Sequence, residues 1–193
     1  SSLGLDDNTV VVFTSDNGGE RFSENWPFKG MKSELLEGGL RVPLIVRWPG
    51  LTTPGSTSDT PVLSMDFLPT FLAAAGGAPD PAFPSDGIDA RAAFAGASLP
   101  DRPLFWRFGL REQKAARLGR YKYLSIDGNE FLFDIIADPQ ERANLKDRHP
   151  DIFADLRSRH QQWDQDMLHD PTARSYGFEP HQLADHFGPV TGK

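Results

Sequence analysis

The first half of the chain alternates between continuous apolar runs and polar clusters. Residues 9–14 contain an unbroken Val-Val-Val-Phe run, which predicts a strand buried on both faces, as in a parallel sheet. Residues 44–48, Leu-Ile-Val-Arg-Trp, predict a second strand that ends at the following Pro-Gly pair. A helix is predicted from its cap at Ser64 to the glycines at 76–77, because apolar residues recur between them at helical spacing.

The second half shows the pattern of paired strands followed by a helix. Turn signals such as Gly119-Arg120 separate four short segments, which predict a small antiparallel sheet. The predicted strands are 104–108, 113–118, 121–126 and 131–135. Residues 150–167 place apolar side chains on one side and charges on the other, so an amphipathic helix is expected to cover one face of this sheet.

A proline- and glycine-rich stretch at 78–103 separates the two halves and predicts a connection between structural parts. We therefore expect residues 1–97 to belong to a large α/β domain and residues 98–193 to form a small C-terminal α+β subdomain with a polar tail. A strand at 9–14 needs partner strands. Its place so near the first residue predicts that the chain begins inside a larger fold. Without that fold, its apolar edge would cause self-association or leave the chain dependent on the missing part.

Charge and composition exclude several classes of partner. The 193-residue chain carries a formal net charge of -7 and lacks the clustered lysines and arginines of a nucleic-acid surface. No apolar run approaches the roughly 18 residues that span a bilayer, and no signal peptide is visible at the first residues. The absence of cysteine excludes disulfides, zinc-thiolate sites and cysteine nucleophiles within this sequence.

A carboxylate and an amide follow directly after the first predicted strand, at Asp16 and Asn17. In open α/β sheets, ligands collect at the carboxyl ends of the strands. Both side chains offer hard oxygen donors, which suit Ca²⁺ or Mg²⁺ better than zinc. Asp, Asn and Gly are also common turn formers, so a simple turn is the alternative interpretation.

Two lysines, Lys29 and Lys32, lie further along the chain in a glycine-containing segment. A lysine in such a loop can approach an anionic oxygen and neutralise a sulfate or phosphate ester beside a cation. The alternative is a solvated surface lysine, because lysine is rarely buried. Spacing alone does not decide between the two.

Several motifs in fixed order resemble the second half of the sulfatase family, within the alkaline-phosphatase-like superfamily. They are Asp-Asn-Gly-Gly after an apolar strand, Lys-Gly-x-Lys, Glu-Gly-Gly-x-Arg-Val-Pro and Ile-Val-Arg-Trp-Pro-Gly, and the similarity continues to about Trp163. The resemblance implies an α/β fold class, namely the C-terminal part of an alkaline-phosphatase-like sulfatase fold that ends in a small antiparallel sheet packed by a helix.

The resemblance also implies roles for individual residues. Asp16 and Asn17 match two ligands of an active-site Ca²⁺, with Mg²⁺ the less favoured ion, and Lys32 matches a catalytic residue that contacts the sulfate group. Lys29 has the better case for a structural role. Two-zinc phosphate hydrolases of the superfamily usually show Asp-His-Gly at this place, so Asn17 favours the sulfatase branch.

The nucleophile of the family is a formylglycine made from Cys or Ser in a Cys/Ser-x-Pro-x-Arg motif. Ser98 begins such a pattern, but it follows the metal pair and lacks a helix start that would hold an anion, so we expect the nucleophile outside this chain. The chain alone is then expected to be inactive.

The paired aspartates and leaving-group histidines of the family also have no match in this sequence. The five histidines are expected mostly at the surface, although a tail that folds back would bring His169 or His181 to a cleft. They lie at 149, 160, 169, 181 and 186.

The resemblance implies two partners, a sulfate-ester small molecule or sulfated glycan, and the remainder of the sulfatase chain. No nucleic acid and no membrane span are expected. Two alternatives stay open, a phosphonate or phosphate diester hydrolase of the same superfamily and a non-catalytic binding or assembly module.

Overall fold

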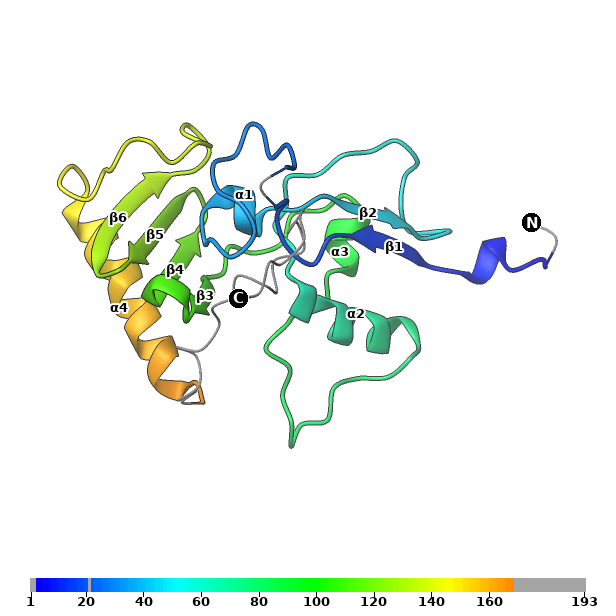
Figure 1. Ribbon diagram of the computed structural model, residues 1–193. Coiled ribbons are helices and arrows are strands. Elements are labelled where there is room, and N and C mark those ends of the chain that lie inside the picture. Colours follow the sequence, from blue (N-terminus) through cyan, green and yellow to red (C-terminus); the bar gives the residue numbers. More distant parts are fainter. Residues whose placement is uncertain (1–2, 21, 169–193) are drawn as a thin grey trace, which may run out of the picture. The chain divides into compact units, whose positions relative to one another are not determined.

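The computed structural model of the protein describes residues 3–20 and 22–168, and these form two compact units (Figure 1). One unit contains residues up to 15 together with Pro43–Asp101, and the other contains Asp16–Val42 together with the residues from Arg102 onward. Residues 16–42 therefore group with the C-terminal sheet, whereas the sequence placed them with residues 1–97. The reason is that their contacts are with residues about 80 to 100 positions later in the chain.

Two short antiparallel strands open the first unit. Strand β1 (Val11–Thr14) pairs with β2 (Leu44–Arg47), and Phe13 lies opposite Ile45. The predicted double burial of this strand is wrong in the described structure, because the side chains of Phe13 and Ile45 are 64% and 62% exposed. A strand is buried on both faces only when layers cover both, and among the described residues β1 pairs with β2 alone in a two-stranded sheet.

The predicted helix of the first unit is confirmed as α2 (Phe67–Ala74), preceded by a 3₁₀ turn at Ser64–Asp66. Ser64 makes no capping hydrogen bond. Instead the buried carboxylate of Asp66 accepts hydrogen bonds from the backbone N–H groups of Leu63 and Ile88, at 2.8 and 2.9 Å. A short helix, α3 (Arg91–Phe94), follows in the proline- and glycine-rich stretch and was not predicted.

The C-terminal sheet of the second unit is an antiparallel meander in the order β3-β4-β5-β6, as predicted. Its strands are Leu104–Phe108, Gln113–Leu118, Tyr121–Ile126 and Asn129–Asp134, so that β6 begins two residues earlier than expected. Asp127 and Gly128 form the loop between β5 and β6, and both have positive φ values, 50° and 77°. Two left-handed residues in a two-residue hairpin match the right-handed twist of the strands.

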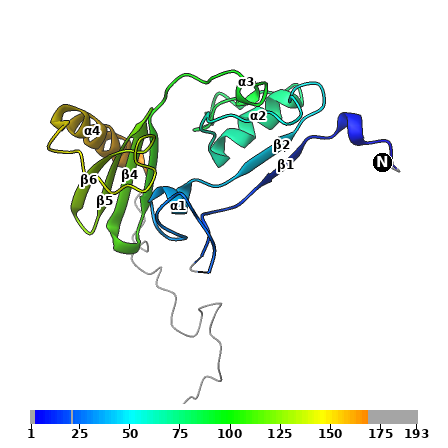
Figure 2. The same ribbon diagram turned by 90° about the horizontal axis from the view of Figure 1, so that it is seen from above.

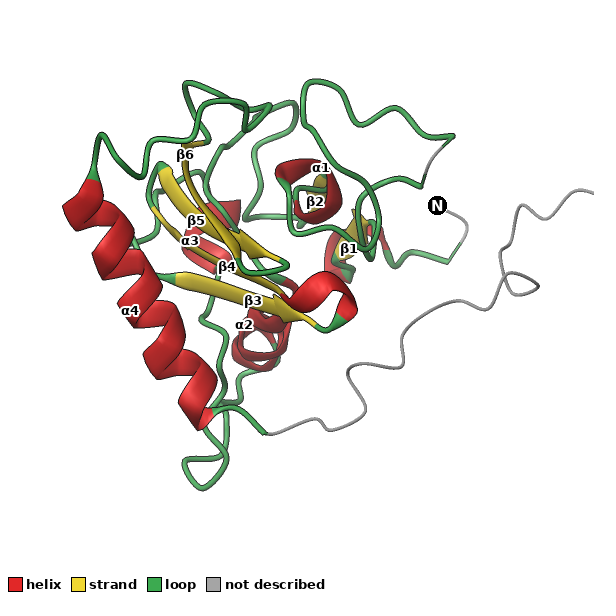
Figure 3. Cartoon of the chain, turned by 60° about the vertical axis from the view of Figure 1, so that its left-hand side comes forward, coloured by secondary structure: helices red, strands yellow, loops and turns green. Residues whose placement is uncertain are grey.

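Each face of this sheet has its own apolar cover (Figure 2). The amphipathic helix α4 (Pro150–Asp166) lies along one face, where Leu156 packs against Ala116, Tyr123 and Leu132 (Figure 3). On the other face, Leu35 joins Ala115, Leu124, Phe133 and Ile135, and it lies just before the short helix α1 (Glu37–Leu40). Neighbouring residues of one strand therefore belong to different clusters, as the two-residue period of a strand requires.

One predicted surface histidine is buried. His160 on α4 is 1% exposed, and its ring lies among the rings of Phe105, Tyr123 and Trp163. Its Nε2 atom lies 3.0 Å from the carbonyl oxygen of Trp106. Burial lowers the pKa of His160, because the protonated ring would lose its hydration.

Three other histidines, at 169, 181 and 186, lie outside the described residues, as does the polar tail. No helix within residues 3–20 and 22–168 is long and apolar enough to cross a membrane.

Candidate functional site

Asp16 and Asn17 lie in a turn that follows β1 in the sequence. The backbone N–H of Asn17 donates to Oδ1 of Asp16 at 3.1 Å, and the side-chain amide of Asn17 donates to the carbonyl oxygen of Gly18 at 2.9 Å. Asp16 is exposed and Asn17 is half-buried. These two hydrogen bonds are typical of a turn and do not test metal binding, so the metal-binding role of the pair stays a prediction.

The glycines after this pair allow two backbone segments to touch. Gly18 donates its N–H to the carbonyl oxygen of Gly39 at 2.9 Å, and a Cβ atom on Gly18 would lie 1.7 Å from the carbonyl oxygen of Gly38. A Cβ atom on Gly39 would lie 2.0 Å from the carbonyl oxygen of Glu34. Only glycine fits at such distances, which explains why Gly-Gly occurs in both motifs.

A closed loop brings Lys32 next to the turn. The backbone N–H of Lys32 donates to the carbonyl oxygen of Gly19 at 3.0 Å. Asn25, which the sequence reasoning missed, spans the loop, because its carboxamide bonds the N–H and carbonyl of Gly19 and also the carbonyl of Gly30, at 3.0 to 3.2 Å. Two predicted site segments, 16–19 and 29–32, are therefore joined through their backbones.

The ammonium group of Lys32 lies 3.8 Å from a carboxylate oxygen of Glu20. The two side chains are 38% and 55% exposed, and an exposed pair at this distance holds its members weakly. Lys29 is exposed, and its carbonyl oxygen accepts the N–H of Gly38 at 2.7 Å. This bond involves the backbone and not the side chain, so the structural role of Lys29 stays a prediction.

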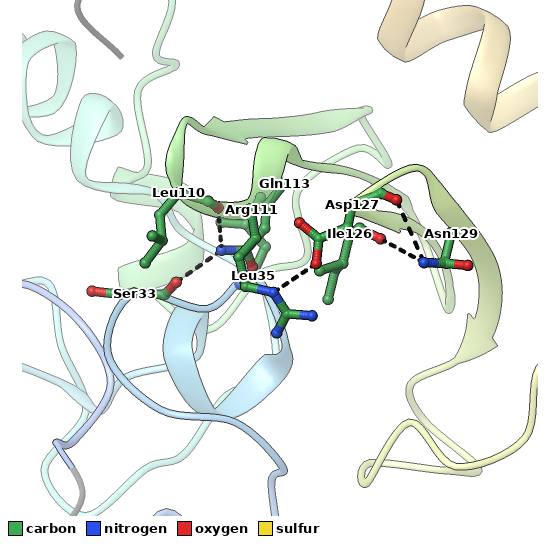
Figure 4. Close-up of polar contacts among 8 residues, drawn as sticks. All are labelled: Ser33, Leu35, Leu110, Arg111, Gln113, Ile126, Asp127 and Asn129. Atoms are coloured by element: carbon green, nitrogen blue, oxygen red, sulfur yellow. Dashed lines mark hydrogen bonds and ion pairs between the residues drawn. The ribbon is translucent and has the colours of Figure 1, made fainter. Parts of the chain in front are cut away.

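The residues after Lys32 are fixed to the sheet by Gln113, another residue that the sequence reasoning missed (Figure 4). The side-chain oxygen of Gln113 accepts the N–H of Leu35, and its nitrogen donates to the carbonyl oxygens of Ser33 and Leu110, all at 2.9 Å. Gln113 is only 2% exposed. The sequence did contain one sign of its burial. Gln113 lies two positions before Ala115 on the same predicted strand, so the two side chains are expected on the same face.

A second polar anchor fixes α1 to the sheet. The buried ammonium of Lys122 lies 2.9 Å from Oε1 of Glu37 and 2.9 Å from Oε1 of Glu141. Oε1 of Glu141 forms an ion pair with Lys122 but no hydrogen bond. Oε2 of Glu141 accepts a hydrogen bond from the N–H of Glu37 at 2.6 Å. Burial raises the pKa of Glu141, and the opposing attraction of Lys122 does not cancel this effect.

Two of the predicted residues are hard-oxygen donors that suit Ca²⁺ chemically. A full Ca²⁺ site uses six to eight oxygens. Residues 3–20 and 22–168 contain no cluster of three or more His, Cys, Asp or Glu side chains that could hold a metal. Asp16 and Asn17 thus fit as part of a site whose other ligands would come from elsewhere.

Comparison with known proteins identifies relatives for most of the chain. The family model described as Sulfatase matches residues 1–78. N-acetylgalactosamine-6-sulfatase of Canis lupus familiaris is 40% identical over 126 residues, which are 62% of this chain and 24% of that protein. Arylsulfatase A of Homo sapiens is 35% identical over 169 residues, which are 80% of this chain and 32% of that protein.

The chain belongs to the sulfatase family. Its fold agrees, because the solved structure of Ps i-CgsB in complex with k-i-k-neocarrahexaose superimposes with a TM-score of 0.78 at 30% identity, over 91% of this chain and 40% of that one. The predicted fold class is confirmed as α/β, of the alkaline-phosphatase-like sulfatase type with a four-stranded antiparallel sheet packed by a helix. The chain matches 24% and 32% of the length of these two curated sulfatases.

Membership of the sulfatase family does not by itself test the three site residues. A phosphonate monoester hydrolase of Agrobacterium radiobacter shares the fold with a TM-score of 0.64 at 21% identity, over 86% of this chain and 37% of that one. At that identity the likeness concerns the fold alone. The roles of Asp16, Asn17 and Lys32 therefore stay predictions.

Proposed function

We propose that this chain is one portion of an enzyme that hydrolyses sulfate esters, and that Asp16, Asn17 and Lys32 belong to its active site. The observation that carries the proposal is the hydrogen bond between Lys32 and Gly19. This bond joins the backbone of Lys32 to Gly19, two residues after Asn17, within a chain of the sulfatase family, and so supports a shared role for the three residues. The substrates proposed are sulfate-ester small molecules or sulfated glycans.

Each of the three residues has a distinct task in this proposal. Asp16 and Asn17 supply a carboxylate and an amide oxygen to Ca²⁺, or less favourably Mg²⁺, and the cation would polarise the ester and its nucleophile when bound. Lys32 places its ammonium against the sulfate oxygens and neutralises the charge that they carry. The weak contact with Glu20 would be exchanged for the stronger contact with an anionic ester.

The nucleophile of the proposed enzyme is a formylglycine outside this chain. Ser98, the one residue here that begins a Ser-x-Pro-x-Arg pattern, is exposed and lies in the segment between α3 and β3. It has no helix start after it that would bind an anion. The chain needs the remainder of a sulfatase for turnover.

The proposal is tested by comparing Lys32→Ala with Lys29→Ala in a polypeptide that also carries the formylglycine motif, with 4-nitrophenyl sulfate as substrate. Loss of a group that stabilises charge in the transition state typically lowers kcat by about 100-fold to 1,000-fold. We expect that loss for Lys32→Ala and less than about a tenth of it for Lys29→Ala. Equal activity of the two variants would contradict the role of Lys32.

The choice between sulfate and phosphate chemistry needs both ester classes on the same enzyme. Asn17 in place of histidine favours a single hard cation over two zinc ions, and we expect the sulfate ester to be hydrolysed with the higher kcat/KM. A higher kcat/KM for a phosphonate monoester or a phosphate diester would favour the alternative hydrolase. A polypeptide that hydrolyses neither ester but still binds a sulfated glycan would favour a non-catalytic binding module.

A further inference from the structure

Gln113 is a buried amide whose two polar atoms are used mainly by the segment that carries Lys32. Two of its three hydrogen bonds reach Ser33 and Leu35, and the third reaches Leu110 beside its own strand (Figure 4). A buried amide that is satisfied at both ends has one orientation and cannot rotate without losing these bonds. Gln113 therefore fixes the path of the backbone one to three residues after Lys32.

The backbone that Gln113 fixes includes one residue in an unfavourable conformation. Ser33 has a φ of 72°, in the left-handed region that costs a residue with a side chain about 1 kcal/mol or more. The carbonyl of Ser33 and the N–H of Leu35 are the two groups bonded by Gln113, on either side of Glu34. On the other side, the N–H of Lys32 is bonded to Gly19. Lys32 is thus held from both directions.

The position of Gln113 is itself determined by the residues before its strand. Arg111 and Glu112 have positive φ values of 59° and 46°, and they turn the chain into β4. Arg111 donates to the carboxylate of Asp127 at 2.8 Å, and its carbonyl oxygen accepts the N–H of Asp127 at the same distance (Figure 4). The hairpin between β5 and β6 therefore supports the turn that presents Gln113.

We propose that Gln113 is a positioning residue for Lys32: its buried carboxamide sets the left-handed turn at Ser33 and thereby the position of Lys32, whose N–H bonds to Gly19 and whose ammonium lies near Glu20. The proposal deepens the sulfate-binding role proposed above and rests on it for its relevance to activity. Whether Gln113 determines the surroundings of Lys32 can be tested independently of whether Lys32 binds sulfate.

The test compares Gln113→Leu with Leu156→Ala in the full 193-residue chain. Leucine removes all three hydrogen bonds at nearly constant volume, while Leu156→Ala destabilises the opposite face of the same sheet, where α4 packs. The measurements are the NMR signal of the Lys32 side chain in protein with isotope-labelled lysine, assigned through Lys32→Arg, and the amide hydrogen exchange of residues 33–35. Lys29 is the internal reference.

We expect Gln113→Leu to shift the signal of Lys32 but not that of Lys29, and to raise amide exchange at Leu35 by at least about 10-fold, the effect of losing one hydrogen bond worth about 1.4 kcal/mol. Leu156→Ala should leave the Lys32 signal in place. If Gln113→Leu does not fold, Gln113→Asn, which retains the amide but shortens its reach, replaces it with the same expected shift. An unmoved Lys32 signal in a folded Gln113 variant overturns the proposal.

Titration with inorganic sulfate separates this proposal from the proposed function. Sulfate should shift the Lys32 signal of the wild-type chain, and about 10-fold more sulfate should be needed in Gln113→Leu, for a loss of about 1.4 kcal/mol. Should sulfate leave the wild-type signal unchanged while Gln113→Leu still moves it, the sulfate-binding role of Lys32 fails and the positioning role of Gln113 stands. Equal sulfate affinity of the wild-type chain and the variant overturns the positioning role.

Discussion

At the scale of single residues, the candidate site depends on positions where backbone atoms approach closely. Gly18, Gly38 and Gly39 bring two segments together, and a side chain on any of them would overlap a carbonyl oxygen. The sequence displays these glycines, but it does not show what they touch. Asn25 and Gln113 are less visible in the sequence, because a single polar residue among others gives no sign that both ends of its amide are bonded.

Gly18→Ala tests this close approach directly. The new methyl group would lie 1.7 Å from the carbonyl oxygen of Gly38, so the hydrogen bond from Gly18 to Gly39 must lengthen or break. We expect a loss of about 1 to 3 kcal/mol in the free energy of unfolding, measured by urea denaturation. Gly77→Ala is the matched control, because its nearest atom, the carbonyl oxygen of Leu72, is 3.4 Å away. A Gly18 variant as stable as the Gly77 variant would refute the close packing.

At the scale of elements, α4 and the segment with α1 cover opposite faces of the four-stranded sheet. The strands and α4 were predicted within about two residues because their periods, two and 3.6, are written into the local order of apolar residues. The short helix α1 was missed, since four residues carry no periodic signal and its glycines suggest a loop. The burial of Lys122 could have been predicted, because Lys122 alternates with Leu124 and Ile126 on the same face of one strand.

The packing of α4 predicts a pH dependence through His160. Burial lowers its pKa in the folded state, so its contribution to stability is fully present above the ordinary histidine value and is lost as the pH falls through and below that value. We expect the free energy of unfolding to decrease between pH 7 and pH 5 by up to about 1.4 kcal/mol per pH unit from this group. His160→Gln, which keeps a donor for the carbonyl of Trp106, should flatten the curve. Parallel curves for the two proteins would show that His160 does not contribute.

At the scale of the whole molecule, the first unit exposes an apolar surface. Val11, Phe13 and Ile45 lie on one face of the β1-β2 ribbon, because Phe13 is opposite Ile45 and Val11 is two residues away. On α2 and the turn before it, Met65, Leu68 and Phe71 are also exposed, at helical spacing. Exposed strands and apolar patches of this kind favour association.

We therefore expect the purified chain to self-associate at micromolar concentration, as light scattering would show by a mass above 21.4 kDa. The double substitution Phe13→Ser and Ile45→Ser should reduce the measured mass toward that of the monomer, because it removes the two largest exposed apolar side chains of the ribbon. Ser58→Ala, in an exposed loop, is the control substitution. A wild-type chain that scatters as a monomer would contradict this expectation.

The proposed Ca²⁺ site predicts weak metal binding by the chain alone. In the proposed site, Asp16 and Asn17 would provide only two of the six to eight oxygens that Ca²⁺ uses, so calorimetric titration of the chain alone should give a Kd of about 1 mM or weaker. Asp16→Ala should abolish even this binding, whereas Asp127→Ala, on the β5-β6 hairpin, should not change it. Micromolar binding by the wild-type chain would mean that further ligands lie within it.

The sequence by itself determined the four-stranded meander, the helix α4 and the order of motifs that marks the sulfatase family, because each of these is encoded by residues close together along the chain. Only the tertiary structure decided that β1 pairs antiparallel with β2, that residues 16–42 pack on the C-terminal sheet, and that Gln113 and Lys122 meet partners 78 and 85 residues away. Such contacts form when segments that are distant in the sequence are buried against one another. The local pattern of apolar and polar residues does not indicate which polar groups will be partners.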